Sequence, residues 1–275
     1  MRIYHEAPLA IFERVKKMTD GDYALVHLCA ESEEYAQKFR RVEDRHIILD
    51  NSIFELGTSF EMEDFSKWIL DLLPNEYIVP DTLEDASATC RQFAEWMKYF
   101  WPHLPGKPIG VLQGKNTHQL YDCYQTLHAL GALKIAISFD YSFWLDDYAQ
   151  AASNEWEAMM LGRAMFIESL KEQPFFDRSV PIHLLGCALP QEMKFYTYDQ
   201  DVNIESVDTS NPVLHGLMGI RYSITEGLKE KNTTKIADVM FEDVSDLRWE
   251  DIKWNMQQFH RYVNGMRSFH KLDKS

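Results

Sequence analysis

Cysteine is scarce in this chain, and its four cysteines are Cys29, Cys90, Cys123 and Cys187. No two of them have the short spacing of zinc ligands, which excludes a zinc knuckle and predicts that the protein holds no structural metal. The sequence also predicts no other cofactor. Isolated cysteines of this kind are typical of reduced thiols in a cytoplasmic protein.

Long hydrophobic runs are missing as well. The apolar stretches are short, for example Tyr23–Leu28, whereas a membrane-spanning helix needs about 20 apolar residues. The first residues, Met1–Ala10, lack the basic, apolar and small-residue regions of a secretory signal. We therefore expect no membrane association and a cytoplasmic location.

Basic residues are outnumbered, with 28 Lys and Arg against 43 Asp and Glu, for a formal net charge of −15. A protein that binds nucleic acid mainly through phosphate contacts is expected to be basic, so this balance argues against a simple nucleic-acid-binding module. An enzyme with a local basic groove remains compatible with it, because net charge averages over the whole surface.

Short apolar strands alternate with amphipathic helical stretches such as Met62–Leu73 along the chain. Seven strands are predicted: Tyr23–Leu28, His46–Leu49, Tyr77–Val79, Ile109–Leu112, Lys134–Ile137, Ile182–Leu185 and Ile204–Val207. This alternation indicates βαβ units and a parallel sheet. Their spacing is close to the roughly 30 residues per unit of a (β/α)8 TIM-like barrel. No eighth strand is recognisable, so the final unit is expected to be irregular or missing.

One domain is predicted over residues 1–275, because no repeat or linker interrupts the chain and α/β barrels reach about 250 residues as single domains. A helix is predicted at about residues 249–270 (Trp249–His270), where apolar residues recur at spacings of three and four. One apolar face of this kind predicts that the helix packs on the outside of the barrel.

Polar side chains follow the predicted strands at the points where they end. They include Asp50, Asp81, Gln113 with Gly114, Ser138 and Asp208. In a (β/α)8 barrel the carboxyl ends of all strands meet at one mouth, where the active site lies. We therefore expect these residues, which are far apart in the sequence, to face one another.

Each of these residues also has a structural alternative. An aspartate directly after a strand often caps the next helix, an alternative that is strongest for Asp81 and weaker for Asp50 and Asp208. Gln113 and Gly114 could form an ordinary turn. Three further polar residues are expected to lie away from the chemistry, Glu55 and Asp140 at the periphery and His183 in the core.

At these strand ends the chain resembles the tRNA-guanine transglycosylase superfamily, most closely the members that place 7-deazaguanines into phage and bacterial DNA. The matching segments are Asp50–Glu55, Asp81, Val111–Gly114, Ile137–Phe139, Leu185–Ala188 and Asp208–Pro212. Ser52 and Ile53 stand where the family has two glycines, and its Cys-rich zinc site is missing. These departures favour the DNA branch over a tRNA substrate.

The resemblance implies an enzyme that replaces guanine in DNA with a 7-deazaguanine such as 7-cyano-7-deazaguanine. In such an enzyme Asp208 would attack C1′ and form a covalent glycosyl-aspartate, and Asp50 would move the proton between the bases. Phe54 would stack on the base, although a core role is equally compatible with its position. The base-binding set is thus Asp81, Gln113, Gly114, Phe54 and Ser138.

Three alternatives stay open: a tRNA-guanine transglycosylase, an N-glycosylase that uses water or phosphate in place of a second base, and a base-binding subunit without turnover. The expected partners are DNA, or alternatively tRNA, and a free 7-deazaguanine base. Phosphate contacts are expected from local basic groups such as Lys115, Arg163 and Arg221. A phage-encoded member would work in the cytoplasm of its host.

Overall fold

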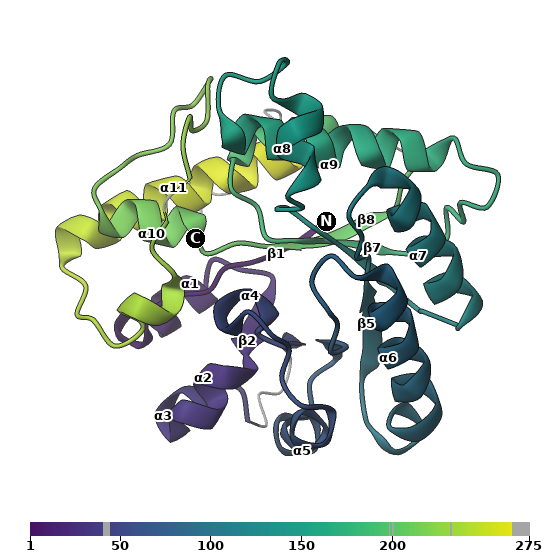
Figure 1. The fold of residues 1–275 in the computed structure, drawn as a ribbon. Coiled ribbons are helices and arrows are strands. Elements are labelled where there is room, and N and C mark those ends of the chain that lie inside the picture. The colour runs from purple at the N-terminus through teal and green to yellow at the C-terminus, as the bar shows by residue number, and fades with distance from the viewer. Residues whose placement is uncertain (41–44, 198, 200, 232, 266–275) are drawn as a thin grey trace.

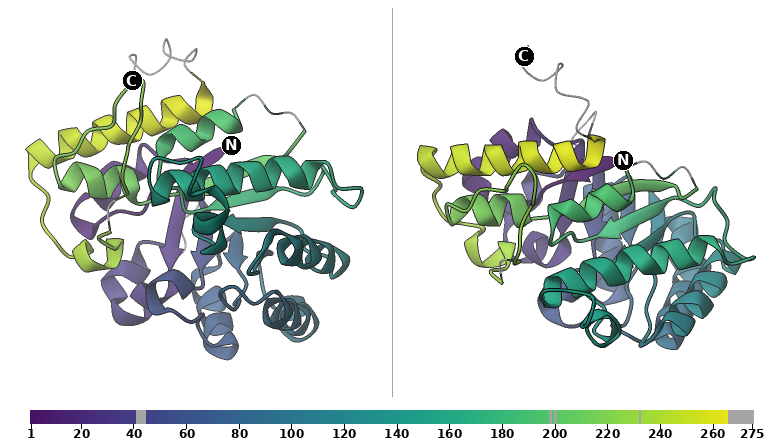
Figure 2. Two further views of the ribbon diagram at one scale, coloured as in Figure 1. Left: turned by 45° about the horizontal axis from the view of Figure 1, so that its top comes forward. Right: turned by 90° about the horizontal axis from the view of Figure 1, so that it is seen from above.

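The computed structural model describes residues 1–40, 45–197, 199, 201–231 and 233–265. Within them, eight parallel strands form one sheet in the order β1-β8-β7-β6-β5-β4-β3-β2, which curls into a nearly closed barrel with helices around it (Figures 1 and 2). The strands are β1 (Arg2–Tyr4), β2 (Gly21–Leu25), β3 (His46–Asp50), β4 (Glu76–Ile78), β5 (Lys107–Val111), β6 (Ile135–Ser138), β7 (Ile182–Leu185) and β8 (Ile204–Asp208). The predicted (β/α)8 TIM-like fold is confirmed.

Two details of the strand prediction are wrong. The barrel has no missing final unit, because β1 supplies the eighth strand by pairing in parallel with β8. With only three residues, β1 is too short to show a periodic pattern. The strand predicted at Tyr23–Leu28 ends at Leu25, where the chain turns into helix α2 (Val26–Glu31).

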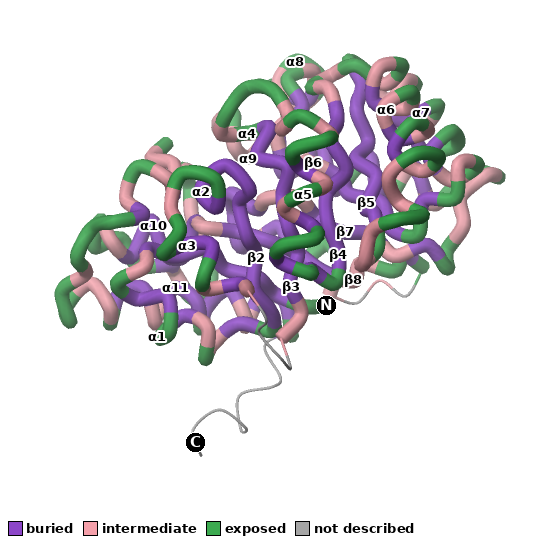
Figure 3. The backbone as a smooth tube through the Cα atoms, turned by 90° about the horizontal axis from the view of Figure 1, so that it is seen from below, coloured by how far each residue is buried: buried purple, intermediate pink, exposed green. Residues whose placement is uncertain are grey.

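Helices cover the outside of the barrel, and Figure 3 shows buried strands inside a shell of partly exposed helices. The α-helices other than α2 are α1 (Phe12–Lys16), α3 (Glu33–Gln37), α4 (Ile53–Leu56), α5 (Met62–Leu72), α6 (Ala86–Tyr99), α7 (Thr117–Ala129), α8 (Phe143–Tyr148), α9 (Glu155–Lys171), α10 (Asn211–Leu217) and α11 (Asp246–Asn264). Short 3-10 helices are η1 (Leu9–Ile11), η2 (Trp101–His103), η3 (Pro190–Phe195) and η4 (Ile236–Val239). In the described part of the chain, no helix is long and apolar enough to cross a membrane.

The predicted C-terminal helix is α11, which starts a little earlier than expected because Ser245 caps it by accepting a hydrogen bond from the Arg248 N–H. Residues 266–270 of that prediction lie outside the described residues. Helix α11 packs along α10 on the outer face (Figure 2), and a Cβ on Gly216 of α10 would lie 2.5 Å from the Ile252 backbone. The glycine therefore permits this close approach.

The end of the barrel away from the strand carboxyl ends is held by buried charge. Lys134 is 2% exposed, and its Nζ lies 2.8 Å from Glu76 Oε2 of β4 and 2.8 Å from Glu205 Oε2 of β8. A buried ammonium group is stable only when it is paired in this way. The three side chains thus join strands on different sides of the barrel.

The barrel closes where β1 meets β2. The Ile3 N–H donates to Asp20 Oδ2 at 2.8 Å, and the Asp20 N–H donates to the Ile3 carbonyl at 3.0 Å. The Tyr4 ring lies directly over Gly21, and its hydroxyl reaches His46 Nδ1 at 2.9 Å. Only a residue without a side chain leaves room for this ring.

We predict that Gly21→Ala destabilises the barrel at this closure. The new Cβ would stand 2.3 Å from Tyr4 Cε1 and 2.5 Å from the His46 carbonyl oxygen, so the free energy of unfolding should fall by about 1–3 kcal/mol. Urea denaturation measures this loss. The matched control is Gly110→Ala in β5, whose Cβ would meet only side chains at 3.1 Å and beyond, and a smaller loss is expected there. Equal losses would contradict the account of the closure.

Candidate functional site

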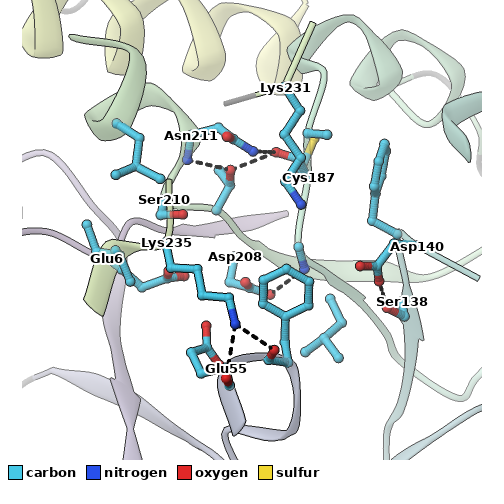
Figure 4. Close-up of a pocket in the computed structure, with 18 of the residues that line it drawn as sticks. Glu6, Glu55, Ser138, Asp140, Cys187, Asp208, Ser210, Asn211, Lys231 and Lys235 are labelled. Carbon is cyan, nitrogen blue, oxygen red and sulfur yellow. Dashed lines mark hydrogen bonds between the residues drawn. The ribbon is translucent and has the colours of Figure 1, made fainter. Parts of the chain in front are cut away.

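A cavity of about 270 Å³ opens at the carboxyl ends of the strands, and we call it the mouth cavity (Figure 4). Residues at or after the ends of β1, β2, β3, β6, β7 and β8 line it, together with the segment at 231–236. The predicted site residues Asp50, Phe54, Ser138 and Asp208 are all on its wall. The barrel therefore brings these four residues together as expected from their places after strands.

Asp208 is the last residue of β8, and its protein contacts are made by one carboxylate oxygen, Oδ1. Its Oδ1 accepts a hydrogen bond from the Gly186 N–H at 2.9 Å and lies 3.0 Å from His183 Nε2. Gly186 has a φ of 68°, a conformation that favours glycine, and this turn aims its N–H at Asp208. Among the described residues no hydrogen bond engages Oδ2, so this oxygen is available to a ligand in the cavity.

His183 is a buried residue of β7, as predicted, but it also contacts the site. Burial lowers the pKa of His183 although the Asp208 carboxylate opposes this effect, so the ring is neutral near pH 7. Its Nδ1 lies 2.9 Å from Ser206 Oγ, and its Nε2 lies 3.0 Å from Asp208 Oδ1. The contact between His183 and Asp208 could not be predicted from the sequence, because the pairing of β7 with β8 in the folded sheet brings the two residues together.

Asp50 ends β3 on the same cavity. Its Oδ2 accepts a hydrogen bond from the Tyr23 hydroxyl at 2.7 Å, and its Oδ1 accepts one from the Ser52 N–H at 2.5 Å. Burial, followed by the nearby charge of Glu55, raises the pKa of Asp50 to about 8, and Asp208 adds to the shift. Asp50 therefore carries a proton at neutral pH and can still release it, as a group that transfers protons requires.

Further carboxylates share the cavity. Glu6 follows β1 and is buried, and both its burial and the charge of Asp208 raise its pKa well above the ordinary value. Glu55 and Asp140 also line the wall, which corrects the expectation that they are peripheral. Glu6 escaped prediction because β1 was not recognised, although polar residues after the Arg-Ile-Tyr run gave the same signal as at the other strand ends.

Asp81 and Gln113 lie beneath the cavity and do not line it. Asp81 Oδ1 accepts a hydrogen bond from Asn51 Nδ2 and its Oδ2 accepts one from Gln113 Nε2, each at 2.7 Å. Gln113 Oε1 in turn accepts the Glu84 N–H at 2.8 Å. Both side chains are buried, and these hydrogen bonds join the ends of β3, β4 and β5. The absence of both residues from the cavity wall does not favour base reading by this pair.

The structural alternatives at these positions are now distinguishable. Asp81 does not cap α6, because Asp85 does so by accepting the Ala88 N–H at 2.8 Å. Gly114 packs against α7, where an added Cβ would lie 2.8 Å from Gln119 Cβ. Phe54 is 49% exposed at the cavity rim, which rules out the core role.

Arg163 does not serve the expected phosphate contact, because it is completely buried. Its guanidinium binds both carboxylate oxygens of Glu192, at 2.7 and 2.9 Å. It also donates to the carbonyls of Ile137, Leu185 and Gly186 at 2.8–3.1 Å. Arg163 therefore fixes the carboxyl ends of β6 and β7, including the turn whose N–H binds Asp208.

The other two basic residues expected at phosphates are also away from the mouth cavity. Arg221 Nε lies 2.6 Å from Asp251 Oδ1 of α11. Lys115 lines a separate hollow between α6 and α7. Neither belongs to the cavity wall.

Among the residues that the structure describes, no group of three or more His, Cys, Asp or Glu side chains is arranged to hold a metal ion. A comparison with models of protein families and with curated proteins finds no match to this chain. The side chains of the cavity are therefore the basis for its chemistry.

We predict that Asp50→Asn stabilises the fold, and more so at pH 8 than at pH 5. The folded pKa of about 8 exceeds the ordinary 3.8, so the folded state keeps a proton that the unfolded chain releases between these values. Wild-type stability therefore falls as pH rises through this window. Asparagine mimics the protonated carboxyl and removes this loss. Thermal unfolding at the two pH values measures the difference.

The control for this experiment is Asp199→Asn. Partial burial alone would raise the pKa of Asp199, but the Lys171 ammonium and the Asp201 N–H outweigh it and hold the pKa below the ordinary value. The ionised Asp199 carboxylate therefore stabilises the fold at both pH 5 and pH 8. Asp199→Asn should be less stable than wild type at each pH. If Asp50→Asn also destabilises at pH 8, Asp50 is not a proton-holding buried acid.

Proposed function

We propose that the protein is a base-exchange transglycosylase, a pentosyltransferase that replaces guanine in DNA with a 7-deazaguanine base. The observation that supports this most is the pair of aspartates in the mouth cavity. Asp208 has one carboxylate oxygen held by donors and the other without one among the described residues, while Asp50 holds a proton near neutral pH. The motif resemblance at the strand ends points to the same reaction.

The first half-reaction uses both groups. The free oxygen of Asp208 forms a bond to C1′ while the C1′–N9 bond breaks, and its electron pair leaves with the guanine. The proton on Asp50 passes to the departing base, which leaves as neutral guanine. The Gly186 N–H and His183 keep the carboxylate in place during the attack.

The second half-reaction reverses these steps with another base. The incoming 7-deazaguanine attacks C1′, the ester bond to Asp208 breaks, and the proton lost by the base returns to Asp50. The negative charge of the Asp208 carboxylate favours the positive charge that develops on the sugar. A cavity of about 270 Å³ suits one nucleoside and not a duplex, so the target nucleotide would be flipped or single-stranded. We place this reaction in the cytoplasm.

The base would lie between the rim and the wall of the cavity. Phe54 offers an exposed ring at the rim, and Ser138 Oγ donates to Asp140 Oδ1 at 2.9 Å on the wall. These groups provide a stacking face and polar partners for a purine edge. Asp81 and Gln113, which do not line the cavity, brace the strand ends, and Gly114 packs against α7.

We predict that Asp208→Asn lowers exchange of labelled guanine by at least about 10³-fold, because the amide cannot form the ester. Asp50→Asn should lower it by about 10²–10⁴-fold and still allow a covalent adduct. Incorporation of label into DNA measures exchange, and a denaturing gel reports the adduct. Asp177→Asn, a change at a half-buried residue that does not line the cavity, serves as the control.

The wild-type result separates this proposal from its alternatives. Incorporation of label into tRNA alone would assign a tRNA enzyme. Release of guanine without incorporation would assign an N-glycosylase, and base binding without either would assign a binding subunit. An adduct that survives in Asp208→Asn would give the nucleophilic role to another residue.

A further inference from the structure

The rim of the mouth cavity carries positive charge above a wall of carboxylates. Among the described residues that line the cavity, the basic ones are Lys231 and Lys235, both from the segment between α10 and η4. Figure 4 shows both side chains reaching into the cavity, with Lys235 above Glu55. The two lysines are half-buried, whereas Glu6, Asp50 and Asp208 are buried, so the cations are more accessible than these three acids.

Neither lysine is neutralised by a direct ion pair with a carboxylate in the part of the chain that the structure describes. Lys235 Nζ donates to the backbone carbonyls of Phe54 and Glu55, at 3.4 and 3.0 Å. By contrast, Arg163 and Arg221 have carboxylate partners at 2.6–2.7 Å. The two rim lysines thus keep capacity for an anionic ligand in a protein whose net charge is −15.

Aromatic rings accompany these lysines. The ammonium groups of Lys231 and Lys235 lie 4.9 and 5.4 Å from the centroid of the Phe54 ring, and Lys231 also lies 5.4 Å from that of Trp156. An anion that draws the ammonium groups away would uncover the face of Phe54. Cations that track a backbone beside rings that stack on bases are the pattern by which proteins bind single-stranded nucleic acid.

We propose that Lys231 and Lys235 bind backbone phosphates next to the target nucleotide, and that Phe54 and Trp156 stack on neighbouring or target bases. This inference rests on the proposed function and names the side chains that would hold the strand on either side of the target nucleotide, contacts that a free nucleoside cannot make. A cavity of about 270 Å³ is filled by one nucleoside, so cations at its rim meet the groups that connect this nucleoside to the chain.

Fluorescence anisotropy with a labelled single-stranded DNA of 12 nucleotides and a central guanine tests the proposal between 50 and 200 mM salt. Lys231→Gln and Lys235→Gln should each raise Kd about three- to tenfold and reduce the slope of log K against log salt by about 0.7. Lys229→Gln, an exposed lysine of the same segment outside the cavity, should change neither quantity. Phe54→Leu should weaken binding without changing the slope.

Deoxyguanosine and its 5′-monophosphate identify which ligand the lysines recognise. Deoxyguanosine binding should be unchanged in the double lysine variant, because it carries no phosphate. Lysine-dependent binding of the monophosphate as tight as that of the DNA would assign a mononucleotide site and overturn the proposal. The proposal would also be overturned if the wild-type protein did not bind the DNA. The same holds if the lysine variants kept the wild-type Kd and the wild-type slope of log K against log salt.

The binding assay separates this inference from the proposed reaction. Lysine-dependent DNA binding without base exchange by wild type would leave the inference standing and remove the transglycosylase. If the variant with both Lys231→Gln and Lys235→Gln kept base exchange and the wild-type Kd for DNA, the transglycosylase would stand and the inference about the lysines would fail. The unfolding temperature of each variant confirms that the changes act on binding and not on the fold.

Discussion

The hydrogen bond from the Gly186 N–H to Asp208 Oδ1 fixes the carboxylate on which the site depends. That N–H is aimed by a left-handed turn, and the turn is held by Arg163, whose guanidinium also joins the ends of β6 and β7. Arg163 stays in the core only because Glu192 neutralises it, and breaking a buried pair of this kind costs about 3–5 kcal/mol. The orientation of the Asp208 carboxylate thus rests on an ion pair whose residues do not line the cavity.

Burial of acids in one small space explains the chemical character of the cavity. Asp50, Glu6 and Glu55 all have raised pKa values, with desolvation as the main cause and mutual repulsion as a further one. A protonated acid and a carboxylate in one cavity are the two groups that the proposed reaction needs as proton donor and nucleophile. The lysines at the rim offset part of the repulsion, since their charge lowers the pKa of Glu55.

The barrel and the meeting of Asp50 with Asp208 could be predicted from the sequence, because each residue follows an apolar run and parallel strands end at one mouth. The short strand β1 could not be predicted, because three residues carry no periodic pattern. The place of Glu6 on the cavity wall, which follows from β1, could not be predicted either. The partners of Asp81 and Gln113 were also beyond prediction, because their hydrogen bonds join three different strand ends. A fully buried Arg163 contradicts the usual exposure of arginine and depends on a partner 29 residues away.

The central claim is that Asp208 becomes covalently bound to the sugar, and tandem mass spectrometry of peptides from protein quenched during turnover tests it most directly. After nuclease digestion of the DNA, the account predicts that the peptide with Asp208 carries the mass of a baseless deoxyribose phosphate. This addition should be localised to Asp208 and removed when a 7-deazaguanine base is added before quenching. An addition localised to Asp50 or Glu6, or exchange that proceeds with no addition to the protein, would contradict it.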